Sequence, residues 1–337
     1  MKTYYRPIAM TDAARLAGAL PLAGGWCWFD RVEVLTREGS RGLMAAADVP
    51  ADVRARLTGP RADLGGLSFG QPTLMGILNV TPDSFSDGGR FIETDAAVAQ
   101  ARALLETADI LDIGGESTRP GAAEVSVAEE IARTAPVIRA LRAAGVSAPI
   151  SIDTRKAEVA EAALDAGASF VNDVAALTYD AGLGPLVASR GVPLCLMHSQ
   201  GTPATMQVDP QYEDVLLDVY DFLEERIGAA EAAGISRARI ITDPGIGFGK
   251  NIQHNLNLIR GLSLFHGLGC PILLGASRKR FIGTIGQAPE ADRRGPGTLA
   301  VTLAGIAQGV QIHRVHDTTE TRQALRLWQA IGTGTEE

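Results

Sequence analysis

From about residue 73 onward, hydrophobic and polar positions follow one repeated pattern, in which a short apolar run ends in polar or glycine-rich residues and a longer alanine-rich segment follows. The short run is typical of a buried strand, and the longer segment is typical of an amphipathic helix. Eight runs fit the strand pattern, namely TLMGILN (73–79), DILDIG (109–114), PISID (149–153), SFVND (169–173), PLCLMH (193–198), RIITD (239–243), PILLGA (271–276) and QIHRVH (311–316). Strands alternating with helices form a parallel sheet, and eight such units close a TIM (β/α)8 barrel of the α/β class. We therefore predict this fold.

The first 72 residues do not follow the repeat. WCWFDRVEVLTREG indicates a pair of strands, and DVPADVRARLTG indicates a short helix. We predict an N-terminal α+β extension over residues 1–72 and a barrel over residues 73–337, joined through the segment 64–72. No catalytic constellation is visible in the extension, which favours a structural or interface role. The last helix is predicted to begin at Asp317, where Asp-Thr-Thr-Glu supplies an N-cap and a carboxylate three residues later.

Composition fits a large globular enzyme, because 337 residues with 46% hydrophobic and 21% charged residues can bury one barrel core and a modest extra piece. No run approaches the roughly 20 apolar residues of a membrane span, and the N-terminus lacks the layout of a signal peptide, so we expect a cytoplasmic enzyme with no membrane partner. The net charge of −8 argues against a general nucleic-acid binder. Cys27, Cys195 and Cys270 are far apart and are predicted to be buried thiols.

Polar residues stand where the predicted strands end, which is where a (β/α)8 barrel carries its chemistry. From the first strand to the eighth they are Asn79, Asp112 with Glu116, Asp153, Asn172, His198, Asp243, Lys279, and Arg314 with His316. Side chains alternate along a strand, so Ile312, Arg314 and His316 share one face. If Ile312 packs inside the barrel, Arg314 and His316 point into its mouth. The alternative is that both lie on a solvent-facing rim.

One set of these residues suits a flat heterocycle that forms hydrogen bonds. Asp153, Asn172 and Asp243 supply acceptors and an amide, and Lys279 supplies a donor. A carboxylate that accepts two N–H bonds from an amino-pyrimidinone edge makes a charge-assisted, bidentate contact. For a single acid, a loop cap or a pair with an arginine is the simpler interpretation. Acids at several strand ends favour the heterocycle.

A second set suits an anion. It comprises Asn79, Arg119, Arg314 and His316, together with glycine-rich loops at 87–89, 113–117 and 245–250. Guanidinium and imidazole donors, backbone N–H groups and a magnesium ion would together hold a diphosphate. The side-chain oxygen of Asn79 is sufficient as a protein ligand, because phosphate oxygens and waters complete the magnesium shell.

Two further features bear on the site. GIGFGK (245–250) is not a nucleotide-binding Walker A loop, because Asn251 stands where Ser or Thr is required. Phe85 and Phe248 lie in polar, glycine-rich loops, where an aromatic ring needs a partner to be buried. A ring-shaped substrate would provide that partner.

Several motifs resemble those of the dihydropteroate synthase family. They are MGILNVTPDSFSDGGRF (75–91), GGESTRPGA (114–122), SIDTRK (151–156), VND (171–173), MHSQGTPATMQ (197–207), DPGIGFGK (243–250), GASRKRFIG (275–283) and IHRVHD (312–317). They span the whole predicted barrel in the family's order. The resemblance implies condensation of a dihydropterin methyl diphosphate with 4-aminobenzoate, in a homodimer that uses Mg²⁺.

The resemblance also implies roles for individual residues. Asn79 would contact the magnesium ion. The pterin would be bound by Asp153, Asn172, Asp243 and Lys279; the diphosphate by Thr118, Arg314 and His316; and the 4-aminobenzoate by Phe85, Pro120, Phe248, Ser277 and Lys279. Asp87 and Arg119, in loops that close over the ligands in the family, would act in catalysis together with Lys279.

The implied reaction is loss of magnesium diphosphate from the pterin methylene, followed by attack of the arylamine nitrogen. Two other functions stay open. A pterin-binding methyltransferase that acts on a methylated folate shares the barrel and the pterin-facing acids, but it gives no reason for TPDSFSDGG, STRPG and SRK. A barrel without catalytic activity gives no reason to retain Asn79, Lys279, Arg314 and His316 together.

Overall fold

A computed structural model describes residues 1–80, 90–117, 124–201 and 205–334 of the chain. Within these ranges, no helix is both long enough and apolar enough to cross a membrane. All three cysteines are buried, and none forms a disulfide, as predicted.

The predicted barrel is confirmed. Its eight parallel strands pair in the order β11-β10-β9-β8-β7-β6-β13-β12, and they are β6 Thr73–Asn79, β7 Ile110–Gly114, β8 Ile150–Asp153, β9 Phe170–Asp173, β10 Leu194–Met197, β11 Ile240–Asp243, β12 Leu273–Leu274 and β13 Ile312–Val315. A parallel bridge between Thr242 and Ile272 joins the two ends of this order and closes the ring. β12 is shorter than predicted, because Pro271 has no N–H to donate and the chain leaves the ladder at Gly275.

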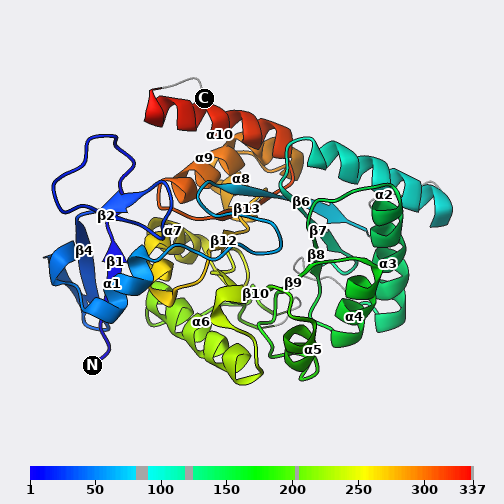
Figure 1. The fold of residues 1–337 in the computed structure, drawn as a ribbon, viewed down its shortest axis with the longest axis horizontal. Helices are drawn as coiled ribbons and strands as arrows, with labels where there is room; N and C mark the ends of the chain where they lie inside the picture. Colours follow the sequence, from blue (N-terminus) through cyan, green and yellow to red (C-terminus); the bar gives the residue numbers. More distant parts are fainter. Residues whose placement is uncertain (81–89, 118–123, 202–204, 335–337) are drawn as a thin grey trace.

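Helices surround the strands on the outside of the barrel (Figure 1). They are α2 Arg90–Leu105, α3 Val127–Ala143, α4 Ala157–Ala166, α5 Leu183–Arg190, α6 Val215–Ala232, α7 Ile252–Arg260, α8 Arg280–Ile285, α9 Gly295–Ile306 and α10 Thr318–Thr333, with 3-10 turns at η3 Arg237–Arg239, η4 Leu262–Leu268 and η5 Ala291–Arg294. α10 begins one residue after Asp317, which occupies the N-cap position. The expected side-chain cap is absent, because the Asp317 carboxylate instead accepts hydrogen bonds from Arg278.

The inside of the barrel is filled at its N-terminal end by side chains from the strand starts. This cluster contains Met75, Ile110, Phe170, Cys195, Ile241, Leu273 and Ile312, together with Leu64, Leu67 and Phe69. The segment 64–72 is therefore more than a junction, because its apolar residues close the bottom of the barrel. A side chain at Gly65 would collide with the Phe170 ring, since a Cβ there would lie 2.4 Å from it. With this end filled, only the C-terminal end of the barrel can admit a ligand.

The N-terminal residues form an α+β unit at one side of the barrel (Figure 1). It contains an antiparallel sheet in the order β1-β4-β5, and its elements are β1 Tyr4–Pro7, β2 Leu20–Pro21, β3 Trp28–Phe29, β4 Arg31–Thr36, β5 Gly39–Ala45, η1 Ala46–Asp48 and α1 Ala51–Thr58. Leu22, Phe29 and Leu57 belong to a core of its own. The unit is bound to the barrel by hydrogen bonds, among them Ser263 Oγ to the Pro7 carbonyl at 2.8 Å. Its separation as a domain at residue 72 stays a prediction.

Candidate active site

The C-terminal ends of the strands bring together polar and charged side chains from several parts of the chain. Asp112 comes from β7, Asp153 from β8, Asn172 from β9, Asp243 from β11 and Arg314 from β13. Asp112, Asp153, Asn172 and Asp243 each follow, two positions later on the same strand, a residue that faces the inside of the barrel. That residue is Ser151 in the case of Asp153 and an apolar residue in the other three cases. Because side chains alternate along a strand, the four polar side chains face the inside as well. Arg314 likewise follows Ile312, which packs inside the barrel, so the predicted inward direction of Arg314 is confirmed.

Arg314 lies at the centre of this group. Its Nε donates to Asp112 Oδ2 at 2.6 Å, and its terminal nitrogen donates to Asp153 Oδ2 at 2.9 Å. Asn172 Nδ2 donates to the same Asp112 oxygen at 3.1 Å. Asp153 is a predicted member of the set that suits a heterocycle, and Arg314 is a predicted member of the set that suits an anion. Arg314 connects the two sets, because it is hydrogen-bonded to Asp153. Asp153 is therefore paired with an arginine, which is the simpler interpretation for a single acid.

Burial sets the electrostatics of this group. It raises the pKa of Asp153 to about 7, and the nearby Asp112 charge adds to that effect while Arg314 opposes it. Burial works against the charge on Arg314, but Asp112 and Asp153 outweigh it, so the pKa of the guanidinium is raised. Asp112 Oδ1 and Ser151 Oγ are buried and have no hydrogen-bond partner among the described residues. Buried acceptors are normally satisfied, so these two atoms are available to donors from a ligand or from water.

Asp243 and Lys279 form the other side of the mouth. Asp243 Oδ1 accepts a 2.7 Å hydrogen bond from the Gly245 amide, so this acid caps the loop that follows its own strand. The Lys279 ammonium lies over the Phe248 ring, 4.0 Å from its centroid. A cation above an aromatic face is attracted by the ring quadrupole. The structure thus brings predicted residues from the seventh strand end and from the GIGFGK loop into contact.

Three backbone amides of the GIGFGK loop form hydrogen bonds within the protein. The Gly245 amide donates to Asp243, the Gly247 amide donates to Asn255 Oδ1 at 2.7 Å, and the Phe248 amide donates to the Gly245 carbonyl. These three N–H groups are already used within the protein, and a role of this loop in holding an anion stays a prediction. Its visible contribution is the half-buried Phe248 ring.

Ser277, His316 and Asn79 complete the described part of the mouth. Ser277 Oγ lies 2.9 Å from His316 Nδ1 and accepts a hydrogen bond from the His316 amide at 3.2 Å. Ser277 thereby holds the imidazole in place. Asn79 ends β6, half-buried and paired in register with Gly114.

The remaining predicted residues lie outside the described residues. They are Phe85, Asp87, Thr118, Arg119 and Pro120. Their roles stay predictions.

Two residues without a predicted role, Asp112 and Lys250, lie in the site. Asp112 was noted only as a strand-end acid, yet it accepts hydrogen bonds from both Arg314 and Asn172. The alternation of Ile110, Asp112 and Gly114 along β7 carried the signal, because Ile110 packs inside the barrel. Lys250 was noted only as the end of a failed Walker motif, and it is buried beside Phe248.

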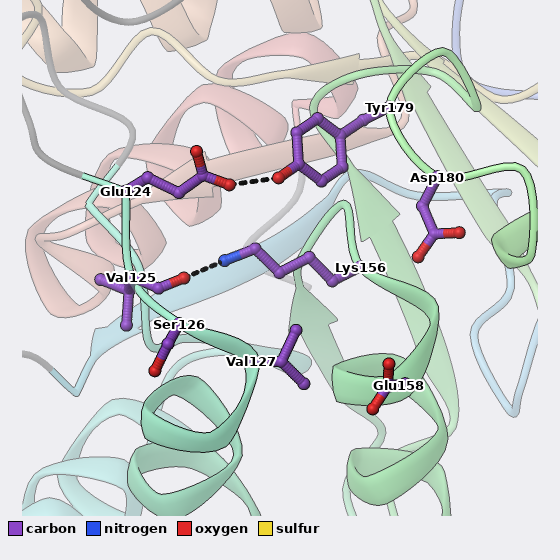
Figure 2. Close-up of a pocket in the computed structure, with 8 residues that line it drawn as sticks. All are labelled: Glu124, Val125, Ser126, Val127, Lys156, Glu158, Tyr179 and Asp180. Atoms are coloured by element: carbon purple, nitrogen blue, oxygen red, sulfur yellow. Dashed lines mark hydrogen bonds between the residues drawn. The ribbon is translucent and has the colours of Figure 1, made fainter.

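A surface hollow of about 480 Å³ lies beside the mouth, between the segments that follow β7, β8 and β9 (Figure 2). None of the predicted site residues lines it. Figure 2 shows the Lys156 ammonium directed at the Val125 carbonyl, at 2.6 Å. The same ammonium binds Glu130 at 2.8 Å and Glu116 at 3.1 Å. Its donors are therefore used to neutralise buried acids, which is a structural role.

Comparison with known proteins gives a consistent result. The family described as pterin binding enzyme matches residues 75–316. Dihydropteroate synthase from Neisseria meningitidis serogroup C is 46% identical over 270 residues, which cover 79% of this chain and 95% of that protein. The Escherichia coli K12 enzyme is 45% identical over 265 residues, covering 78% and 93%. A solved structure of Xanthomonas albilineans dihydropteroate synthase with 4-aminobenzoic acid has a TM-score of 0.75 and 47% identity, covering 81% of this chain and 98% of that one.

Proposed function

This chain belongs to the pterin-binding enzyme family, among the dihydropteroate synthases, and from that premise we propose that it condenses (7,8-dihydropterin-6-yl)methyl diphosphate with 4-aminobenzoate to give 7,8-dihydropteroate and diphosphate. The observation that carries the proposal is the set of buried acceptors around Asp112 and Asp153, two of which have no hydrogen-bond partner among the residues that the structure describes. Among solved relatives, one X. albilineans structure holds 4-aminobenzoic acid and another holds 7,8-dihydropteroate. The reaction makes the chain a transferase of a pterinylmethyl group.

In this proposal the pterin enters the barrel with its amino-pyrimidinone edge toward the buried acids. Asp153 and Asp243 accept its N–H groups, Asn172 contributes an amide, and Lys279 donates to a ring acceptor. Orphaned acceptors such as Asp112 Oδ1 are costly when they stay unpaired, so ligand donors at this depth relieve a desolvation penalty. The same barrel depth excludes water from the reacting methylene.

The chemical step breaks the bond between the methylene carbon and the diphosphate oxygen, and the electron pair leaves with the diphosphate. The arylamine nitrogen then forms a bond to the methylene carbon and loses one proton to solvent. Arg314 and His316 lie at the end of β13, where donors stabilise charge that develops on the leaving oxygens. Asp153 and Asp243 stabilise the cationic pterin fragment. Lys279 and Phe248 are placed to orient the second substrate, and Asp87 and Arg119 are proposed to complete the site.

Magnesium is part of the proposal. Within the described ranges, no group of three or more His, Cys, Asp or Glu residues converges to hold a metal. Mg²⁺ does not need such a group, because it retains waters and takes oxygens from substrate phosphates. The Asn79 amide oxygen is a ligand of suitable chemistry, so the residues present fit this ion. When bound there, it would neutralise charge on the leaving diphosphate.

The direct test is to give the purified chain dihydropterin methyl diphosphate, with and without 4-aminobenzoate and with and without magnesium. We expect diphosphate release coupled to dihydropteroate formation, only when both substrates and magnesium are present. Pterin binding without turnover would refute the synthase and favour the methyltransferase or a barrel without catalytic activity. The expected homodimer and cytoplasmic location stay predictions.

Pterin affinity is expected to depend on the ionisation of Asp243. Burial raises its pKa to about 6, although the Gly245 amide and the charge of Lys279 act in the opposite direction. The carboxylate, not the acid, accepts two N–H bonds, so affinity for a dihydropterin should fall about tenfold per pH unit below about pH 6. Calorimetric titration from about pH 5 to pH 8 measures this.

The matched variant for this test is Asp243→Asn. This variant should bind a dihydropterin weakly, and its affinity should lack the part of the pH dependence that comes from Asp243. The part that comes from Asp153, whose pKa is raised to about 7, should remain. Because the folded state raises the Asp243 pKa, the proton stabilises the fold at low pH, and this contribution is lost as pH rises through about 6. The variant should therefore be no less stable than the wild type at about pH 8. An unchanged pH profile of pterin affinity would contradict the role of Asp243.

A further inference from the structure

We propose that Lys250 is a positioning residue, which fixes the peptide of Phe248 and so holds the Phe248 ring against the Lys279 ammonium. The inference rests on the proposed function, because it concerns how the second substrate is oriented. Lys250 lies in the loop between β11 and α7, and it is one of four lysines in the chain. It is 2% exposed.

The Lys250 ammonium has three acceptors around it. Its Nζ donates to the Phe248 carbonyl at 2.9 Å, lies 2.8 Å from His198 Nδ1, and lies 3.5 Å from the His198 carbonyl. Burial lowers the pKa of Lys250 to about 7, and in the protonated form its three donors match these three acceptors. Lys250 therefore acts through other residues and is not a catalytic residue.

The surroundings of Lys250 keep the His198 imidazole neutral, so that it can accept a hydrogen bond from Lys250. Burial lowers the pKa of His198 well below its ordinary value, and the Lys250 charge lowers it further. The imidazole is thus neutral and accepts at Nδ1. The Phe222 ring packs edge-on against it, with centroids 4.8 Å apart. Hydrogen bonds in a dry environment of this kind are stronger than hydrogen bonds in water.

The loop that carries Phe248 depends on side chains for its shape. Its neighbours Gly247 and Gly249 have φ values of +83° and +65°, in a region that other residues rarely adopt. Glycine gives these positions no intrinsic stiffness. The Gly247 carbonyl accepts from Gln207 at 2.7 Å and the Gly249 carbonyl accepts from Tyr212 at 2.8 Å. Lys250 holds the residue between these two glycines, because its ammonium donates a hydrogen bond to the Phe248 carbonyl.

The hydrogen bond from Lys250 to the Phe248 carbonyl determines where the Phe248 ring lies against the Lys279 ammonium. The Lys279 ammonium is 4.0 Å from the Phe248 centroid, and the attraction between a cation and a ring weakens when the ring turns away. Of the acids that would hold the pterin, Asp153 is bonded to Arg314 and not to this loop, and Asp243 is bonded to the loop at Gly245, three residues before Phe248. Loss of the hydrogen bond from Lys250 to the Phe248 carbonyl should therefore disturb the site of the second substrate more than the pterin site.

The first experiment is steady-state kinetics of Lys250→Met, which keeps the apolar stem and removes the donors. We expect kcat/KM for 4-aminobenzoate to fall roughly 10- to 100-fold. Affinity for a dihydropterin alone, measured by calorimetry, should stay within about twofold. Lys2→Met is the matched control, because Lys2 pairs with Asp221 and Glu224 at the surface, and its kinetics should equal the wild type. An equal loss of pterin affinity in Lys250→Met would refute the inference.

A second experiment distinguishes positioning from a general structural role. Phe248→Ala removes the ring, so adding Lys250→Met to it should lower kcat/KM no further, within about twofold. Independent effects that multiply would show that Lys250 does not act through Phe248. If Lys250→Met does not fold, Lys250→Gln replaces it, because the shorter amide cannot reach both His198 and Phe248. In Lys250→Gln we expect a smaller fall in kcat/KM for 4-aminobenzoate, again without a matching loss of affinity for a dihydropterin. If kcat/KM does not fall in this way, the inference is overturned.

The inference and the proposed function can fail separately. If the wild-type chain made no dihydropteroate, the proposed function would fail, and amide hydrogen exchange would still test Lys250. Amides of residues 245–250 should exchange faster in Lys250→Met than in Lys2→Met, while strand β8 stays unchanged. Equal exchange in residues 245–250 of both variants would show that the hydrogen bond from Lys250 does not hold the loop.

Discussion

Replacing Arg314 by Met is expected to reduce the free energy of unfolding by about 3–5 kcal/mol and to abolish turnover. Arg314 is hydrogen-bonded to both Asp112 and Asp153, and Asp112 is 0% exposed. Removal of the guanidinium leaves a buried carboxylate whose main remaining partner is the amide of Asn172. Urea denaturation measures the loss of stability, and dihydropteroate formation measures the loss of function.

Two further variants separate the causes of the Arg314 effect. Asp112→Asn combined with Arg314→Met has no uncompensated charge at residue 112, so it should recover much of the stability without recovering activity. Arg41→Met is the surface control, because Arg41 pairs with Glu38 and both side chains are more than half exposed. Its effect should be under about 1 kcal/mol. If Arg314→Met were as stable as Arg41→Met, the central role of Arg314 in the barrel mouth would be wrong.

Gly245→Ala is expected to lower kcat/KM about 100-fold and to destabilise the fold by about 3 kcal/mol or more. Gly245 has φ +66°, and a Cβ there would lie 1.8 Å from the His198 carbonyl oxygen. The backbone must move to relieve this collision. The Gly245 amide then loses its hydrogen bond to Asp243, and the acid proposed to hold the pterin moves with it.

The control for Gly245→Ala is the same substitution in an open place. Gly228 lies on the exposed face of helix α6, and a Cβ there would have no neighbour within 4 Å. Gly228→Ala should raise stability by up to about 1 kcal/mol, because alanine is the better helix former. Thermal unfolding and kinetics of both variants make the comparison. Similar behaviour of the two would mean that the conformation at Gly245 is not essential.

The barrel and most of its strand positions can be predicted from the sequence alone. Apolar runs separated by amphipathic helices leave few other topologies, and β6 spans residues 73–79 as the pattern predicts. Alternation along a strand also determined the direction of side chains, which is why Arg314 could be placed on the inner face with Ile312. The family was likewise visible in motifs that follow the order of the strands.

Which of these polar residues are partners depends on how the chain folds in three dimensions. Arg314 is 202 residues away from Asp112 in the chain, and the contact between them depends on the closing of the barrel. Asp317 shows the same limit, since its carboxylate binds Arg278 instead of capping α10. Local patterns describe backbone preferences, whereas ion pairs depend on distance and burial in three dimensions.

The GIGFGK loop and the segment 64–72 needed the structure for a similar reason. A glycine-rich loop looks the same in sequence whether its amides face a ligand or the protein, and here Asp243 and Asn255 take two of them. Leu67 and Phe69 looked like parts of a linker, but a hydrophobic side chain is buried wherever the fold leaves apolar space. The sequence thus determined where the site lies, and packing decided how its charges and loops are held.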